Sequence, residues 1–278
     1  MLNNFFIRGD IMADFLVTNM TEFKTACETA DATVILQNDI DANNWAFSTI
    51  SVRCSLIDGQ NHSISNVQFS SNFLYNYDYG STPMTCRDLI FKNCIQYNDE
   101  DYCFIHHGSR QTNSWEFVNC QFQGLFYHFV YYSVTFTNCT FTLESGLKFF
   151  EYNSGLTNTY YNYCIFDFKT QYSNDNQIFF RSYPSNCYFM GTVRNTTTTI
   201  NFFHASCYLQ NCVVNVYITG TTSGSWQAGI LNEAISLYNI DRCNGAGAAS
   251  AFFVGLSDAD LKNYDAVAAT GFPIVRAG

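Results

Sequence analysis

Histidine and charged side chains recur directly after pairs of apolar residues in the middle of the chain. Five copies of this pattern contribute His106, His128, Glu151, Arg181 and His204. The set holds three of the five histidines of the chain, and histidine is the side chain whose charge changes near neutral pH. If successive copies stack, the five side chains form one row. That row could bind a sugar or a neighbouring subunit, and the alternative is a polar strand edge.

Carboxylates that could cleave a polysaccharide are present but do not converge. Glycosidases need two carboxyl groups about 5 Å or about 6.5–9.5 Å apart. Residues 99–101 lie in a polar insertion typical of a solvated turn, and Glu144, Glu151 and Asp167 fall at different positions of the repeating unit. No column of Asp with a matching Arg, as in a calcium-dependent lyase, can be aligned. We therefore expect no catalytic residues and no enzyme, with a polysaccharide-degrading lyase or hydrolase of tailspike type as the alternative.

The twelve cysteines lack the spacing of a metal site. Zinc sites use clustered Cys-x-x-Cys or Cys/His motifs, and the chain has none. The simplest interpretation is a row of reduced cysteines that pack inward as small apolar residues. Disulfides between neighbouring turns and a zinc site are the alternatives, and we expect no metal and no cofactor.

A short motif repeats along the chain: apolar, any residue, Asn, Cys, any residue, apolar. Its copies, some with one substitution, contribute Asn93, Cys94, Asn119, Cys120, Asn138, Cys139, Cys164, Asn186, Cys187, Asn211 and Cys212. With Val67 as the first position, the intervals are 27, 26, 19, 25, 23 and 25 residues. Intervals of this size are typical of one turn of a large solenoid with loops of variable length.

These repeats predict an all-β fold, a single right-handed parallel β-helix. Short runs rich in aromatic and β-branched residues suit two or three strands per turn, and between residues 33 and 240 there is room for roughly nine turns. Asn side chains that stack on successive turns can bond one another in a ladder. We therefore expect Cys94, Cys120, Cys139 and Cys212 to line up along one axis.

Helices are expected at both ends, where unpaired strand edges need a cover. Near the start, Thr21 is the expected cap of a helix over residues 21–30, with Phe23 and Ala30 on its apolar face. Near the end, a helix begins at Ser257, and Gly271 terminates it. The expected organisation is an N-terminal extension over 1–15, in which residues 1–11 are the least certain to be genuine because Met12 is an alternative start. A β-helix with its cap helix follows over 16–242, and a linker with a C-terminal helix and tail occupies 243–278.

Paired apolar residues precede the charged row and indicate a contact surface. One set must fill the core and the other must face outward: Phe104, Phe126, Phe149, Phe179 and Phe202 against Ile105, Tyr127, Phe150, Phe180 and Phe203. An outward aromatic stripe is typical of a partner surface and favours a homotrimer or a docking face.

Composition argues against nucleic-acid and membrane partners. The net charge is −10, and the 13 Lys and Arg residues form no basic run that could bind phosphates. No stretch of 18 apolar residues occurs, and no secretion signal is visible.

The order of the elements resembles a known group of proteins. A strand, the Thr21-Glu-Phe-Lys helix, the strand over 33–36, Asn-bearing coils and an acidic helix that ends near Gly271 follow one another. This order resembles the pectate-lyase-like β-helix superfamily and, within it, small β-helix virion proteins of tailed bacteriophages. The resemblance implies a homotrimeric head fibre, decoration or tail appendage that contacts other virion proteins, with a host glycan as a further partner. It also implies a location on the virion, assembled in the reducing host cytoplasm, which would keep the cysteines reduced.

Overall fold

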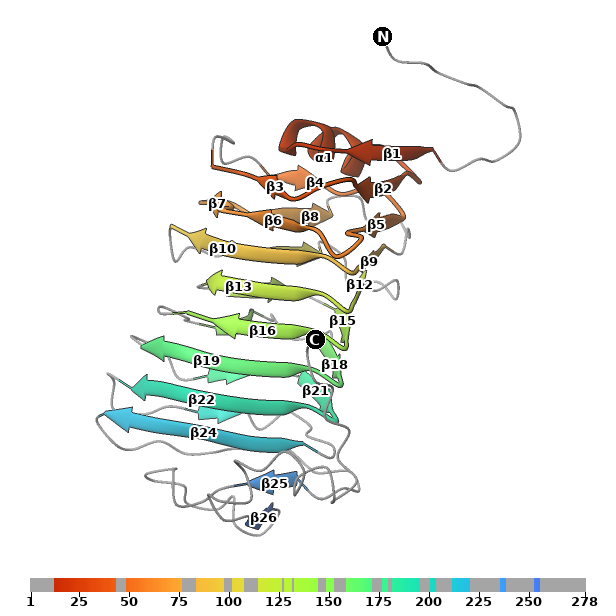
Figure 1. Cartoon of the computed structure of the whole chain (residues 1–278). Helices are drawn as coiled ribbons and strands as arrows, with labels where there is room; N and C mark the ends of the chain where they lie inside the picture. The colour runs from red at the N-terminus through yellow and green to blue at the C-terminus, as the bar shows by residue number, and fades with distance from the viewer. Residues whose placement is uncertain are drawn as a thin grey trace.

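Parallel strands in stacked layers make up most of the structure (Figure 1). The computed structural model describes residues 13–43, 49–76, 84–97, 102–107, 115–126, 128–131, 133–144, 149–152, 159–171, 177–179, 182–195, 201–203, 212–220, 236–238 and 253–255. Within these residues the fold is all-β apart from one helix, which confirms the predicted class.

The strands fall into three main sheets, in each of which neighbouring strands pair in parallel. Sheet A has the order β1 (Asp14–Val17), β2 (Thr33–Leu36), β5 (Leu56–Asp58), β9 (Thr85–Arg87), β12 (Trp115–Val118), β15 (Val134–Thr137), β18 (Thr159–Asn162) and β21 (Ser182–Ser185). Sheet B has the order β3 (Ile40–Asp41), β6 (Ser63–Ser65), β10 (Ile90–Gln96), β13 (Gln121–Leu125), β16 (Thr140–Leu143), β19 (Ile165–Gln171), β22 (Tyr188–Asn195), β24 (Val213–Gly220), β25 (Ser236–Tyr238) and β26 (Phe253–Gly255), with β7 (Gln68–Phe69) also paired to β10.

Sheet C is shorter and completes each layer. Its strands are β4 (Ile50–Ser51), β8 (Leu74–Asn76), β11 (Ile105–His107), β14 (His128–Tyr131) and β17 (Phe149–Tyr152), and β20 (Gln177–Phe179) pairs with β23 (Asn201–Phe203) in a separate two-stranded sheet. From β2 to β17 the chain visits sheets A, B and C in that order again and again. Each strand therefore pairs with the strand one turn later, as the repeat predicts.

The turns differ in length because the loops between the sheets differ. The pairing of Cys86 with Phe117 sets a turn of 31 residues, whereas the pairing of Phe117 with Phe136 sets a turn of 19. The sheets themselves keep their register across these insertions.

Stacked aromatic rings fill the core between the sheets. In sheet B, rings stack in the row Phe91, Phe122, Phe141, Phe166 and Phe189, with centroids 4.6–5.5 Å apart. In sheet A, the rings of Phe117, Phe136 and Tyr161 stack in the same way. Rings of the two rows meet edge to face, so each turn contacts its neighbours along the row and across the core. Such pairs contribute about 0.5–1.5 kcal/mol each beyond the burial of their area.

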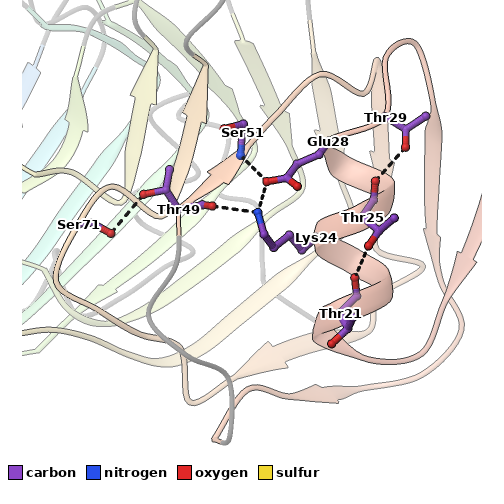
Figure 2. A network of polar contacts seen from close by, with 8 residues as sticks. All are labelled: Thr21, Lys24, Thr25, Glu28, Thr29, Thr49, Ser51 and Ser71. Carbon is purple, nitrogen blue, oxygen red and sulfur yellow. Dashed lines mark hydrogen bonds and ion pairs between the residues drawn. The ribbon is translucent and has the colours of Figure 1, made fainter.

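Helix α1 (Met20–Cys27) covers the first turn. Its buried face is Met20, Phe23, Ala26 and Cys27. Figure 2 shows that Lys24 and Glu28 hold the helix to the edge of sheet C. The Lys24 ammonium donates to the Thr49 carbonyl over 3.2 Å, and the Ser51 N–H donates to the Glu28 carboxylate over 3.2 Å. The predicted cover at this end is therefore confirmed.

The cap residue of this helix differs from the prediction. The side chain of Asn19, not that of Thr21, accepts the Glu22 N–H over 3.0 Å, and the Glu22 carboxylate accepts the N–H and hydroxyl of Thr18. The helix also ends before Ala30, which is exposed. Asn and Thr are both good caps, and the hydrogen bonds of Glu22 with Asn19 and Thr18 favour the earlier start.

Most of the other predictions for the two ends of the chain concern residues that the structure does not describe. Strand β1 crosses the expected boundary at residue 15 and pairs with β2. The predicted helix from Ser257, its end at Gly271, the alternative start at Met12 and the acidic turn over 99–101 lie outside the described residues.

Candidate functional site

Three stacked rings lie on the outer face of sheet C. Tyr75, His106 and Tyr131 occupy equivalent positions of β8, β11 and β14 and are half-buried, whereas Leu74, Ile105 and Val130 point into the core. The ring centroid of His106 lies 4.7 Å from that of Tyr75 and 4.6 Å from that of Tyr131. This aromatic stack is an outward row along successive turns.

The predicted row of charged side chains is wrong in the part that the structure describes. His106 pairs with Tyr75 and Tyr131, and His128 pairs with Phe149 instead of Glu151. Phe129, within β14, is the residue equivalent to Phe104, and their rings stack, so the two copies differ in phase by three residues. Longer loops before β11 than before β14 produce this shift.

Other members of the row cannot be placed or face inward. His128 is buried, with an exposed fraction of 2%. The side chain of Glu151 and the whole of Arg181 and His204 lie outside the described residues.

The prediction that one residue of each apolar pair faces the core and the other faces outward is also wrong among the described residues. Phe104 and Ile105 are both fully buried, because the chain bends into sheet C at Phe104. Phe126 is buried as well. The outward aromatic row is the stack of Tyr75, His106 and Tyr131 instead.

A buried amide ties two turns together near His128. Gln96 is 1% exposed; its amide donates to the Tyr102 carbonyl over 2.7 Å and accepts the His128 N–H over 3.1 Å. The side chain therefore satisfies two backbone groups that the loop would otherwise bury. Its role is to hold the corner between sheets B and C.

A first amide ladder runs along the bend of sheet B. The Asn66 amide donates to the Asp41 carboxylate over 2.9 Å, and the Asn93 amide donates to the Asn66 oxygen over 3.3 Å. Asn66 and Asn93 have φ of 59° and 51°, a conformation that asparagine tolerates well. The Asn66 hydrogen bond is the main cause that holds the pKa of Asp41 below its ordinary value.

A second amide ladder marks the corner between sheets A and B. The Asn119 amide donates to the Asp88 carboxylate over 3.0 Å, and the Asn138 amide donates to the Asn119 oxygen over 2.7 Å. Tyr163 and Asn186 follow at equivalent positions, and φ lies between 51° and 57° at all five. Stacked Asn side chains are thus confirmed, but in two separate ladders.

The predicted column placed Asn93 and Cys94 in the wrong ladder. Cys94 pairs with Gly124, and the residue that precedes β10 as Cys120 precedes β13 is Leu89. Both corners need a residue at positive φ followed by a small apolar residue that points inward. The same motif therefore arises at two places in one turn, and Cys94 does not lie on the axis of Cys120, Cys139 and Cys212.

The remaining cysteines of the motif do form one column. Their thiols donate to the backbone carbonyl of the preceding turn, from Cys139 to Phe117 over 3.4 Å and from Cys164 to Phe136 over 3.5 Å. Cys187 and Cys212 repeat this bond over 3.3 Å and 3.4 Å. Burial raises the pKa of the Cys139, Cys164 and Cys187 thiols well above the ordinary range. These thiols are neutral donors at physiological pH.

Carboxylates of the described turns also hold the fold. One oxygen of Asp58 accepts from Arg87 Nε over 3.1 Å and Nη2 over 2.6 Å, and the other accepts the Gln60 N–H over 3.1 Å. Burial alone would raise the pKa of Asp58. The hydrogen bonds from Arg87 and Gln60 and the positive charge of Arg87 have the larger effect, so the pKa is lowered. Asp39 accepts the Ser63 N–H one turn along over 2.7 Å.

The described residues hold neither a metal-ligand cluster nor a membrane-spanning helix. No group of three or more His, Cys, Asp or Glu side chains there is placed to hold a metal ion. None of the helices in that part of the chain is long and apolar enough to cross a membrane.

Comparisons with known proteins give one structural similarity. No protein-family model matches the sequence, and no curated protein matches it. A solved structure described as a "putative immunoglobulin A1 protease from Bacteroides ovatus" is similar with a TM-score of 0.46 and 11% sequence identity, over 78% of this chain and 84% of that one. At this similarity no function transfers from one chain to the other.

Proposed function

We propose that the chain is a right-handed parallel β-helix of roughly nine turns that serves as a rigid structural protein of a tailed-bacteriophage virion. In this role it is a homotrimeric head fibre, decoration or tail appendage that takes part in particle assembly or host attachment. It assembles in the host cytoplasm and then belongs to the virion.

The observation that carries this proposal is the way in which successive turns are joined. Aromatic rows, two amide ladders and a thiol column run along the stack, and each joins several successive turns. Asp58 and Asp39 serve the same purpose, since each accepts hydrogen bonds from the following turn. Polar groups committed in this way stiffen a rod and favour a mechanical role over a catalytic one.

The outer face of sheet C is the proposed contact surface. The rings of Tyr75 and Tyr131 lie 4.7 Å and 4.6 Å from the His106 ring, so neighbouring rings restrict the face on which a sugar could stack. The three side chains carry hydroxyl and imidazole groups and are half-buried on the outer face of the sheet. A second copy or another virion protein fits this ridge better than a glycan does.

Two measurements test the proposal. Sedimentation of the purified chain gives the mass of the assembly, and antibody labelling of purified particles gives its position. The triple substitution Tyr75→Ser, His106→Ser and Tyr131→Ser should reduce assembly or incorporation while the far-ultraviolet spectrum stays unchanged. A monomer that is absent from particles would refute the proposal, and shortening of a bacterial polysaccharide by the chain would favour the alternative enzyme.

A further inference from the structure

Cys86 continues the line of thiols toward the start of the chain from an offset position, because it pairs with Phe117 in sheet A while Leu89 holds the position equivalent to Cys120. The sulfur atoms of Cys86 and Cys120 are 3.9 Å apart. The backbone N–H of Cys54 donates to the Cys27 carbonyl over 3.0 Å, so these two buried cysteines are neighbours as well. All ten described cysteines are buried, and none of them forms a disulfide.

From Cys120 onward the column is continuous. The five cysteines of this part of the column directly precede β13, β16, β19, β22 and β24, which pair in register: Cys120, Cys139, Cys164, Cys187 and Cys212. Each sulfur therefore has another sulfur on the adjacent turn. Such a line differs from a zinc site, in which four ligands surround one point.

The spacing of this column suits a different coordination geometry. Equivalent atoms on neighbouring strands lie about 4.8 Å apart. Two metal–thiolate bonds of about 2.3 Å in a line span about 4.6 Å, nearly the same distance. Soft ions such as Cu(I) prefer thiolate ligands, and two-coordinate linear binding needs only two of them.

We propose that the thiol column binds soft monovalent d10 metal ions, Cu(I) or Ag(I), each held between the sulfur atoms of adjacent turns. The pair Cys86 and Cys120 forms the first such site, and its sulfurs need to separate by less than about 1 Å from their present 3.9 Å. No three candidate metal ligands converge in the described residues. The column therefore discriminates against metal ions, such as zinc, that need four ligands.

The proton balance follows from the state of the thiols. One ion between two thiols forms two metal–sulfur bonds, releases two protons and leaves one negative charge in the core. When adjacent sites share a thiolate, one proton leaves per sulfur, and ions and thiolates nearly cancel in charge. Filling of neighbouring sites is therefore favoured, because an isolated buried charge is costly.

Silver(I) is the probe, because it is stable in air and does not change oxidation state in this reaction. The full-length chain, freed of reductant, is titrated with silver nitrate in a chloride-free buffer. Bound ions are counted by native mass spectrometry, released protons by pH-stat, and the fold is followed by far-ultraviolet circular dichroism. We expect silver uptake with proton release and an unchanged spectrum, and no tight uptake of zinc.

Matched variants separate the column from other cysteines. Cys120→Ser should lose both sites that share its sulfur, whereas Cys94→Ser changes an equally buried thiol of another column and should lose none. Cys164→Ser repeats the test farther along, should one variant fail to fold. Equal uptake by wild type and Cys120→Ser, uptake only with loss of the β spectrum, or tight zinc binding would each overturn the proposal, whatever the role of the protein on a virion.

Discussion

The second amide ladder is interrupted at Tyr163, and repair of this position gives a sharp test of the ladder. Tyr163 follows Asn138 at the same corner, has φ of 57°, and is 43% exposed. Its backbone N–H donates to the Ser185 carbonyl over 2.9 Å, a bond that any residue preserves. The substitution Tyr163→Asn should place an amide beside the Asn138 oxygen.

The magnitude is best worked against a variant that loses the same ring. Tyr163→Ala removes the tyrosine contacts and keeps a side chain that costs about 1–2 kcal/mol at positive φ. Tyr163→Asn loses the same contacts, relieves about 1 kcal/mol of that cost, and adds one exposed hydrogen bond of about 1 kcal/mol. We therefore expect Tyr163→Asn to be more stable than Tyr163→Ala by about 2 kcal/mol. Tyr163→Gly removes the cost of positive φ but adds no ladder bond. Its more flexible unfolded state lowers the free energy of unfolding by about 0.4–1 kcal/mol.

Urea unfolding measured by circular dichroism checks this order, with equal slopes required for the comparison. Hydrogen exchange of the backbone amides in β18 and β19 measures local stability, because a stack of repeats can unfold in parts. Equal stability of Tyr163→Asn and Tyr163→Ala would refute the account of this corner. Equal stability of Tyr163→Asn and Tyr163→Gly would refute the contribution of the ladder hydrogen bond but not that of the backbone conformation.

Three further outcomes are expected. Asp58→Asn should destabilise the fold at neutral pH by about 1 kcal/mol. Because the folded pKa of Asp58 is lowered, its contribution is complete above the ordinary carboxyl pKa of about 4 and disappears as the pH falls through the lowered value. Urea curves at several pH values should show the two proteins converge in acid, and a constant difference would contradict the pairing with Arg87. Gln96→Leu should cost about 2–4 kcal/mol in the same assay, because the His128 N–H and a loop carbonyl lose their buried partner; a cost below 1 kcal/mol would count against it. Gly191→Ala should cost more than about 3 kcal/mol, since φ is 108° and the added carbon would lie 2.2 Å from a backbone oxygen of the preceding turn; a variant as stable as wild type would refute this.

The sequence alone predicts the period and the class of the fold because both depend on residues that every turn needs. A residue at positive φ followed by an inward apolar residue recurs at the corner between sheets A and B, and Asn-Cys meets this need in Asn119–Cys120 and Asn138–Cys139. Parallel pairing then follows, since equivalent residues of successive turns must stack. The start of the chain was predictable for a similar reason, because the apolar face of α1 includes Phe23 and Cys27.

The phase of each side chain within a turn was not predictable in the same way. Asn93 and Cys94 satisfy the motif at a second bend of sheet B, so spacing alone assigned them to the wrong column. His106 and His128 follow loops of different length, and the distance from the motif therefore does not fix their position in sheet C. Pairing across the sheets decides these positions, and no local pattern encodes it.

The cysteine column could have been traced further from the sequence. Cys27, Cys54 and Cys86 are 27 and 32 residues apart, within the spread of the turns, but none follows an Asn. Cys86 lies in β9, before the corner of its turn at Asp88 and Leu89, and pairs with Ile57 and Phe117. Its thiol therefore reaches the column from sheet A, where the Asn-Cys motif does not mark it.

The two amide ladders point in one direction, and this polarity explains where each begins. Every amide NH₂ group donates toward the start of the chain, from Asn93 to Asn66 and from Asn138 to Asn119. The first member of each ladder must therefore only accept, and an ionised carboxylate has no donor of its own. Asp41 and Asp88 meet that requirement, whereas an Asn there would direct an NH₂ group at a turn with no acceptor in the ladder. Each carboxylate also polarises the amide that donates to it, and that amide in turn accepts from the next turn.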